Sequence, residues 1–432
     1  MSTWPIIDDA PFSSEAPTGG EEMTAPGLFD YKKVVGPDII EELTILASHV
    51  GNRSVKMVNS TAVGGGVAEM LHRIVPLLTE LGIQVEWSVI KGADDFFEIT
   101  KAFHNALQGQ ERDFSDDEFK TYLGYNEMNE KEMNFDQDLI VIHDPQPAAM
   151  IDWNKKRKNK WVWRCHIDLS HPNQQLWQFL KSYIEQYDAA IFTSALFSPE
   201  LSIPQYRFYP AIDPLDEKNR DLQHSYIESV FAKYGIPRDK PIVTQISRYD
   251  PWKDPVGVVQ AFKMARKYID CRLLLVGDKA ADDPESEKIL AQVEAGAGND
   301  PDIHILLFSP SVAREINAFQ RGSDIILQKS LREGFALTVS EGLWKKRPVI
   351  GGAVGGIPAQ IIDGHTGLLV HSVEGASLAI RSLLNRPAFA KSLGANGHQR
   401  VKDEFLITKN LKRYLLLLLA LDRRQGGTIF LS

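Results

Sequence analysis

Cysteine is scarce in this sequence, and so are long apolar runs. Cys165 and Cys271 are the only cysteines among 432 residues, which excludes a disulfide framework and is typical of a reducing compartment. The nearest approach to a membrane span is residues 414–421, far short of the ~18 apolar residues that a span needs. The N-terminus has neither the basic start nor the apolar stretch of a signal peptide. The sequence therefore predicts a cytoplasmic protein without membrane contact, with residues 414–421 in a buried helix.

Basic residues are outnumbered by acidic ones. Lys and Arg total 48 and Asp and Glu total 57, which gives a formal net charge of −9 and argues against a nucleic-acid partner. An Asp-rich metal-binding motif is also missing from the sequence, and we predict no metal ion or other cofactor. Residues 1–30 contain six acidic residues, four prolines and no Lys, Arg or His. Such a segment buries too little apolar surface to offset its ordering entropy, so we predict a disordered acidic tail.

From about residue 54, short apolar runs alternate with amphipathic stretches. The continuous apolar run Leu139–His143 is typical of a strand buried on both faces of a parallel sheet. The alternation predicts an α/β fold with doubly wound sheets. The predicted strands are 55–59, 85–90, 139–143, 161–165, 189–193, 242–246, 273–276, 304–307, 325–328 and 349–350. The predicted helices are 67–81, a stretch that ends near 107, 173–187, 255–268, 285–294, 312–319, 338–344 and 408–421. Residues 110–136 are interpreted as a polar, acid-rich insert.

The composition changes between Ala211 and Asp239, where prolines and charged residues accumulate. We place a domain junction there and predict two Rossmann-like domains, at residues 31–213 and 214–403, facing a central cleft. Residues 404–432 are predicted to carry a Leu-rich helix that crosses back to the N-terminal domain. Ligands of such sheets bind at the carboxyl ends of the strands, so the loops that follow strands are the candidate binding sites.

The first such loop is glycine-rich. Gly64, Gly65 and Gly66 open the helix 67–81, where free N–H groups and a close backbone approach favour an anion. A dinucleotide site is the specific competitor, but Glu69 occupies the third glycine position of its G-x-G-x-x-G motif, and Glu86 lies within a strand rather than at its end. We favour a phosphate- or sugar-binding turn over NAD binding; a tight turn without a ligand is the plain structural alternative.

The second loop is Ser-Arg-Tyr-Asp-Pro-Trp-Lys, residues 247–253, after the strand 242–246. Arg248 offers a fork for phosphate oxygens and Lys253 a compact charge, and each charge-assisted hydrogen bond contributes ~1.5–3 kcal/mol. Together they suit a diphosphate. The alternative is a solvated pair of cations on a surface loop.

The third loop is the most specific. Glu333 and Glu341 are separated by seven residues across a strand-to-helix turn at Gly334. Carboxylates accept paired hydrogen bonds from the vicinal hydroxyls of ribose or hexose, and N–H groups at a helix start hold anions or hydroxyls. We predict that the N–H groups of Phe335, Ala336 and Leu337 and both carboxylates face one elongated ligand. Two surface acids on an exposed helix would be the alternative.

Together these elements resemble the retaining GT-B glycosyltransferases of the glycogen-synthase-like group. The resemblance is stronger to the glycosyl-transferring trehalose synthases, with the retaining trehalose phosphorylases as relatives. It covers roughly residues 30–414 and is carried by the segments NSTAVGGGVAEMLHRIVPLL, FHNALQG, HDPQPAA, WRCHIDLS, QISRYDPWK and REGFALTVSEGLWKKRPVIG. It implies a GT-B fold with an acceptor domain followed by a nucleotide-sugar domain. It also implies that glucose passes from a nucleoside-diphosphate (NDP) glucose to free glucose, giving α,α-trehalose reversibly with retention of configuration.

The resemblance also implies roles for single residues. Arg248 and Lys253 would hold the diphosphate as it leaves, and Glu341 would bind the ribose hydroxyls. His166 would contact the donor sugar near the reacting carbon, and Asp144 would position the acceptor glucose. Without the resemblance, the favoured interpretations are a structural histidine at a strand end and a turn former. The donor glucose would be held by Glu333 and the N–H groups after it, and the donor phosphates would lie under the turn; these donor-binding residues are Gly65, Gly66, Glu333, Gly334, Phe335, Ala336 and Leu337.

Two departures and three alternatives accompany this resemblance. Ala336 stands where many relatives have Gly, and Gly342 where Ala is frequent, so donor choice is less secure than the fold. A retaining trehalose phosphorylase that uses glucose 1-phosphate and inorganic phosphate is the nearest alternative. A non-catalytic two-domain sugar-binding protein and a dehydrogenase are more remote. The apolar helix 408–421 and the relatives together favour a homodimer.

Overall fold

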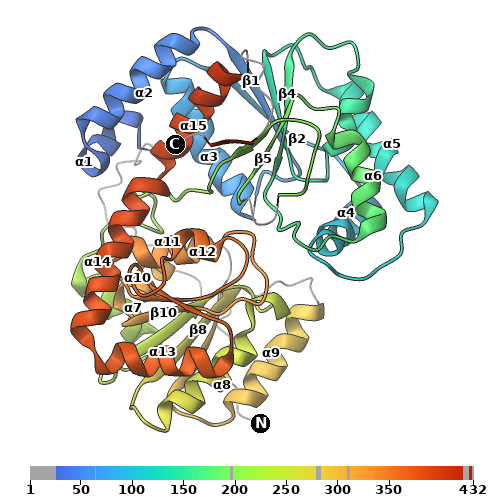
Figure 1. Ribbon diagram of the computed structural model, residues 1–432. Helices are drawn as coiled ribbons and strands as arrows, with labels where there is room; N and C mark the ends of the chain where they lie inside the picture. The colour runs from blue at the N-terminus through green and yellow to red at the C-terminus, as the bar shows by residue number, and fades with distance from the viewer. Residues whose placement is uncertain are drawn as a thin grey trace, which may run out of the picture. The chain divides into compact units, whose positions relative to one another are not determined.

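The structure is a computed structural model that describes residues 26–63, 65–194, 198–278, 284–308, 312–421 and 428–430. The chain divides into two compact units. Unit 1 comprises residues 26–30, Pro214–Leu331 and Thr338–Val401, and unit 2 comprises Tyr31–Asp213, Arg332–Leu337 and the described residues from Lys402 onward. Each unit contains one parallel sheet, so each is described by itself (Figure 1).

Unit 2 is built on a seven-stranded sheet with the order β13-β6-β5-β4-β3-β1-β2, and all of its pairings are parallel. The central strands β3 and β4 are nearly or wholly buried along their length, as continuous apolar runs require. The order reverses between β1 and β3, which makes their carboxyl ends the switch point of this sheet. The strands are β1 (Ser54–Asn59), β2 (Gln84–Val89), β3 (Leu139–His143), β4 (Lys160–Cys165), β5 (Ala189–Phe192), β6 (Gln205–Arg207) and β13 (Thr428–Phe430).

Helices cover both faces of this sheet. The C-terminal helix α15 packs against α2 and α3, far from it in sequence, and Figure 1 shows these three helices together on one side of the sheet. The other side carries α4, α5 and α6 over an aromatic-rich core. The helices of unit 2 are α1 (Lys32–Val35), α2 (Pro37–Val50), α3 (Gly65–Glu80), α4 (Asp94–Leu107), α5 (Asp116–Glu132), α6 (Gln174–Ile184) and α15 (Ile407–Ala420), with the 3-10 helix η2 (Ala148–Trp153).

Most of the polar, acid-rich segment 110–136 is the helix α5, which the sequence did not predict. Ser115 caps this helix reciprocally with Glu118, which satisfies N–H groups at the helix start. The buried positions of α5 are Tyr122, Asn126 and Asn129, so two of the three are polar and the apolar periodicity is weak. Asn129 replaces apolar contact with hydrogen bonds to the N–H and carbonyl of Lys91, at 2.6 and 2.7 Å.

Unit 1 is built on a six-stranded parallel sheet with the order β12-β11-β10-β7-β8-β9. From β7 the chain adds β8 and then β9 towards one edge of the sheet. It then returns to β10, beside β7, and adds β11 and β12 towards the opposite edge. The switch point therefore lies at the carboxyl ends of β7 and β10. The strands are β7 (Ile242–Ile246), β8 (Arg272–Asp278), β9 (Ile303–Phe308), β10 (Ile325–Gln328), β11 (Val349–Gly352) and β12 (Leu368–Val370).

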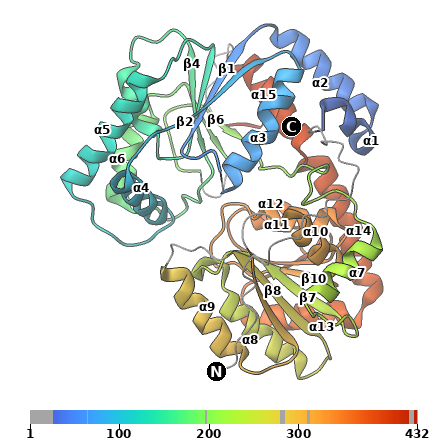
Figure 2. The same cartoon turned by 180° about the vertical axis from the view of Figure 1, so that it is seen from behind.

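Two layers of helices enclose this second sheet, as Figure 2 shows from behind. Helix α8 packs against α9 and α13 on one face, and α7 packs against α10 on the other. Helix α7 lies in the segment that the sequence analysis interpreted as a junction. The helices are α7 (His224–Lys233), α8 (Pro255–Arg266), α9 (Pro284–Ala297), α10 (Ala313–Gly322), α11 (Leu337–Trp344), α12 (Ile357–Gln360), α13 (Val373–Asn385) and α14 (Pro387–Glu404), with the 3-10 helix η4 (Pro251–Lys253).

The predicted fold class, two parallel doubly wound sheets, is confirmed by the strand orders of both units. The apolar run 414–421 lies at the end of α15 and is largely buried, as predicted. Among the described helices, none is long and apolar enough to span a membrane. Residues 1–25 of the predicted acidic tail lie outside the described residues, whereas residues 28–30 belong to the 3-10 helix η1 (Leu28–Tyr31), in which Leu28 is buried.

Candidate active site

The loops after β7 and β10 flank the switch point of unit 1. The N–H of Leu331 donates to the carbonyl of Trp252 at 2.7 Å, and the ammonium of Lys329 forms an ion pair with Asp254. Asp254 also caps α8 by accepting the N–H of Gly257 at 3.0 Å. These contacts join the two loops, so the candidate ligand-binding segment 247–253 is fixed at its C-terminal end.

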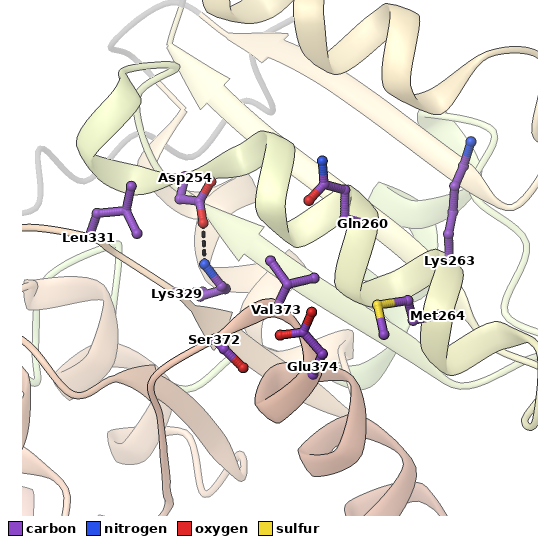
Figure 3. Close-up of a pocket in the computed structure, with 9 residues that line it drawn as sticks. All are labelled: Asp254, Gln260, Lys263, Met264, Lys329, Leu331, Ser372, Val373 and Glu374. Atoms are coloured by element: carbon purple, nitrogen blue, oxygen red, sulfur yellow. Dashed lines mark hydrogen bonds and ion pairs between the residues drawn. The ribbon is translucent and has the colours of Figure 1, made fainter.

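A pocket of about 680 Å³ lies beside the Lys329–Asp254 pair, between the start of α13 and the exposed face of α8 (Figure 3). Its apolar lining includes Leu331, Met264 and Val373. Arg248, Lys253 and Glu341 do not line it. The pocket is therefore separate from the side chains that the sequence assigns to the nucleotide sugar.

Arg248 and Lys253 are arranged by Asp250. One oxygen of this carboxylate accepts the N–H of Lys253 at 3.1 Å and so caps the 3-10 helix η4. The other oxygen lies 3.3 Å from Nη2 of Arg248, whose side chain is 69% exposed. An ion pair this exposed contributes at most ~1 kcal/mol, so a phosphate can compete with Asp250 for the guanidinium. The backbone carbonyl of Lys253 accepts the side-chain amide of Gln245 at 2.8 Å.

Glu341 lies in α11 and is 5% exposed. Its Oε2 accepts a hydrogen bond from Nε2 of Gln320 at 2.9 Å, and its Oε1 lies 3.9 Å from Nζ of Lys218. Lys345, one turn later on the helix, donates to the carbonyl of Glu341 at 3.3 Å and to Oδ1 of Asn219 at 2.8 Å. Burial lowers the pKa of Lys345 to about 7. The carboxylate of Glu341 is therefore held from α10 and from the segment after residue 213.

These neighbours of Glu341 were missed by the sequence analysis. Gln320 and Lys218 come from segments distant in sequence, and no local pattern links them to Glu341. Lys345 is the exception, because it directly follows the end of α11, and its spacing of four residues from Glu341 places the two side chains on the same side of the turn.

In unit 2, Asp144 follows β3 directly and lies at the switch point of the sheet. Its backbone is left-handed, with φ of 65°, and its N–H donates to the carbonyl of Arg164 at 2.8 Å. Its Oδ1 accepts the N–H of His166 at 2.8 Å, and its carbonyl accepts the indole N–H of Trp163 at 2.9 Å. Desolvation raises the pKa of the Asp144 carboxyl to about 7, against the opposing effects of the His166 N–H and Arg164.

His166 directly follows β4, and Asp144 directly follows the neighbouring strand β3. Its Nε2 lies 3.1 Å from Nδ1 of His143, and the two rings are nearly parallel at 11°. Desolvation first, and then the Arg164 guanidinium, hold the pKa of both imidazoles well below the usual 6.5. Both rings are therefore neutral at pH 7.

The segment Arg332–Leu337 brings the third predicted loop to His166 within unit 2. A Cβ on Gly334 would lie 2.7 Å from the carbonyl oxygen of His166, so only glycine permits this approach. Phe335 is buried against Phe405, at 5.6 Å between ring centroids. Glu333, at the start of the segment, is 8% exposed.

The glycine turn after β1 meets the same segment. Gly65 and Gly66 begin α3, and a Cβ on Gly66 would lie 3.6 Å from Cδ1 of Leu337. Gly64 lies outside the described residues. Unit 2 thus gathers Gly66, Asp144, His166 and the segment Arg332–Leu337, while Arg248, Lys253 and Glu341 belong to unit 1.

Both departures from the family pattern have local explanations. Ala336 has a φ of 68°, in the left-handed region where a side chain costs roughly 1–2 kcal/mol, which explains why glycine suits this position. A Cβ on Gly342 would lie 3.1 Å from Ile326 and from Val349. Gly342 therefore permits close packing of α11 on β10 and β11, rather than a ligand contact.

Comparisons with known proteins agree on one family. The family model described as "Trehalose synthase, N-terminal domain" matches residues 57–199, and "Glycosyl transferases group 1" matches residues 227–400. The trehalose synthase of Thermococcus litoralis is 44% identical over 402 residues, which cover 90% of this chain and 96% of that protein. A trehalose phosphorylase of Pleurotus pulmonarius is 28% identical over 461 residues, covering 94% of this chain and 62% of that protein.

A solved structure supports the fold. The α,α-trehalose-phosphate synthase (UDP-forming) of Burkholderia xenovorans, in complex with glucose-6-phosphate, matches with a TM-score of 0.68 at 15% identity, over 85% of this chain and 100% of that chain. At this identity the likeness extends to the fold alone, and it confirms the predicted GT-B class. The sequence identity over nearly the whole length shows the family as well as the fold. This chain belongs to the trehalose synthase family of group 1 glycosyltransferases.

Proposed function

We propose that this chain is a retaining glucosyltransferase that makes α,α-trehalose from NDP-glucose and free glucose, reversibly. The observation that carries the proposal is the pair Arg248 and Lys253 on one capped loop at a sheet switch point, in a chain 44% identical to a trehalose synthase. Two cations there suit the diphosphate of a nucleotide sugar.

Unit 1 would bind the nucleotide. Arg248 and Lys253 hold the diphosphate and neutralise the negative charge that grows as it departs, which is usually a large contribution to transfer catalysis. Glu341 accepts hydrogen bonds from the ribose hydroxyls. Its contact with Gln320 orients the carboxylate before the nucleotide arrives, so less rotational entropy is lost on binding.

Residues of unit 2 would bind the sugars. Glu333 and the N–H groups of Phe335, Ala336 and Leu337 hold the donor glucose, with Gly334 allowing the approach to His166. Gly65 and Gly66 lie over the donor phosphates, His166 contacts the donor sugar near its reacting carbon, and Asp144 positions the acceptor glucose. With a pKa of about 7, the Asp144 carboxyl can both donate to and accept from sugar hydroxyls near neutral pH.

The transfer itself would occur on one face of the sugar. The bond from the anomeric carbon to the diphosphate oxygen breaks, a bond to the hydroxyl oxygen of the acceptor glucose forms on the same face, and the hydroxyl proton passes to the departing phosphate oxygen. No carboxylate of the predicted site is assigned as a nucleophile, which a double-displacement route requires. Trapping of a covalent glucosyl adduct on a side chain would contradict this route.

The test is a product assay. The purified protein is supplied with glucose and, in turn, with the uridine, adenosine and guanosine diphosphate glucoses, then with glucose 1-phosphate. The proposal expects trehalose and NDP from at least one nucleotide sugar. Trehalose from glucose 1-phosphate alone would instead assign a phosphorylase. Sugar binding without any product would assign a binding protein, and NAD binding would favour the dehydrogenase.

A cytoplasmic location and a homodimer complete the proposal. The proposed location rests on the cysteine content. The dimer rests on the apolar character of the C-terminal helix. Fractionation of the native cell tests the first, and sedimentation equilibrium across a concentration series tests the second.

A further inference from the structure

His143 is the residue that contacts the ring of His166. It ends β3, has no exposed surface and is in register with Arg164 of β4. The contact joins His143 Nδ1 to His166 Nε2 at 3.1 Å, with ring centroids 5.4 Å apart. The backbone of His166 is fixed as well, because its N–H donates to Asp144. Among the described residues, His143 is the one side chain with a hydrogen bond or ring contact to the His166 imidazole.

Both imidazoles are neutral near pH 7, because burial and Arg164 keep their pKa well below 6.5. A neutral imidazole has one N–H and one lone pair. The hydrogen bond between the rings uses the N–H of one and the lone pair of the other, which leaves two arrangements. Either His143 donates from Nδ1 and His166 carries its proton on Nδ1, or His166 donates from Nε2 and His143 carries its proton on Nε2.

The charge of Arg164 distinguishes these arrangements. Its guanidinium is buried, donates to the hydroxyl of Tyr414 and packs over the ring of Phe208 at 5.6 Å. Within the described parts of the chain, Arg164 has no ion-pair partner, and neither its Nη2 nor Nε2 of His143 has a hydrogen-bond partner. Arg164 lies beside His143 in register on the adjacent strand, and its charge acts on the His143 imidazole. Because Nδ1 of His143 already contacts His166, a cation that can only donate favours a lone pair on the remaining nitrogen, Nε2, over an N–H there. The proton of His143 therefore belongs on Nδ1.

We propose that His143 is a positioning residue that donates its Nδ1 proton to Nε2 of His166 and so fixes the His166 proton at Nδ1. No described residue forms a hydrogen bond with His166 Nδ1, so this N–H is available to an oxygen of a bound sugar. The inference rests on the proposed function, in which His166 contacts the donor glucose. A ring fixed in this way donates to a sugar oxygen and does not act as a base towards the acceptor hydroxyl.

The direct test measures the tautomers. Two-bond ¹H–¹⁵N correlation spectra of protein with ¹⁵N-labelled histidine rings, at pH 7.5 without substrate, are expected to show His166 and His143 protonated at Nδ1 and bare at Nε2. The His143→Phe variant assigns the signals. A His166 ring protonated at Nε2, or at both nitrogens, would overturn the proposal. This readout needs no turnover, so it stands whether or not the protein makes trehalose.

Kinetics of matched variants separate positioning from packing. His143→Phe keeps a buried ring without an N–H and is expected to lower kcat by about 10- to 100-fold, as loss of a hydrogen bond to the site implies, with a smaller change in KM. His143→Asn places an amide N–H near the Nδ1 position and is expected to stay within about fivefold of wild type. His304→Phe is the control, because Nε2 of His304 is also buried and without a partner in the described structure. Equal losses in the Phe and Asn variants of His143, or full kcat in both, would overturn the proposal.

Discussion

Nε2 of Gln320, on α10, donates a 2.9 Å hydrogen bond to Oε2 of Glu341, on α11, and both residues are buried. The bond fixes a carboxylate whose other oxygen lies 3.9 Å from Lys218. A side chain held in one rotamer before binding loses less entropy when the ligand arrives. The orientation of Glu341 is therefore set by the fold before any ligand binds.

Gln320→Leu is expected to raise KM for NDP-glucose by about tenfold, because a hydrogen bond to a charged carboxylate contributes ~1.5–3 kcal/mol and its loss leaves the buried Glu341 with one partner fewer. Initial rates over a donor series, at fixed glucose, measure the change. Gln260→Leu, on the exposed face of α8, is the control. A KM unaltered by Gln320→Leu would show that Glu341 needs no support from α10.

Arg248→Ala and Lys253→Ala are each expected to lower kcat/KM by about 10- to 100-fold, since each removes a charge-assisted hydrogen bond of ~1.5–3 kcal/mol to the departing diphosphate. Trehalose formation in saturating glucose measures the loss. Lys267→Ala, an exposed cation just after α8, controls for the change in net charge. Full turnover in both variants would remove the basis of the proposed function.

Gly334→Ala is expected to reduce activity by more than about tenfold, because its Cβ would meet the carbonyl of His166 at 2.7 Å and overpacking of this kind costs ~1–3 kcal/mol. Activity and thermal unfolding are measured together. Gly124→Ala in α5 is the matched control, with no atom within 4 Å of the added Cβ. The free energy of unfolding of that control should rise by ~1 kcal/mol, because alanine has the higher helix propensity. A fully active Gly334→Ala would mean that the loop does not approach His166.

Ala336→Gly is expected to raise the free energy of unfolding by ~1 kcal/mol, because Ala336 has a φ of 68° and a Cβ in that region costs roughly 1–2 kcal/mol. The same exchange within α13, Ala379→Gly, should lower stability by ~1 kcal/mol, because glycine weakens helices. Chemical denaturation of the three proteins compares them. Destabilisation of both variants to the same extent would contradict the strain at Ala336.

Asp144→Asn tests the pH dependence. The folded pKa of about 7 lies above the unfolded value of ~3.9, so between these values the folded state binds more protons and stability falls as pH rises. The stabilisation from the protonated carboxyl is fully present below pH ~4 and is lost as the pH rises through about 7. The melting temperature of wild type relative to Asp144→Asn should therefore drop between pH 5 and pH 8. A constant difference would place the Asp144 pKa in its usual range.

The elements of this fold were largely accessible from local patterns. The continuous apolar run of β3 marked a strand that is buried on both faces. The loops at strand ends supplied Arg248, Lys253 and the Glu333–Glu341 element as candidate site residues. Helix α5 escaped because two of its three buried positions are asparagine. Helix α7 escaped because the prolines and charges around it obscure its apolar spacing.

Contiguous residues are enough to predict the two parallel sheets, the three candidate ligand-binding loops and the family. Tertiary structure alone decided what surrounds the key side chains. Gln320 contacts Glu341 from another helix, and His143 contacts His166 from the adjacent strand. Gly334 meets the carbonyl of His166 from a segment 168 positions further along the chain. The physical reason is that a hydrogen bond depends on distance and direction in space, which are set by strand register and helix packing and not by local sequence.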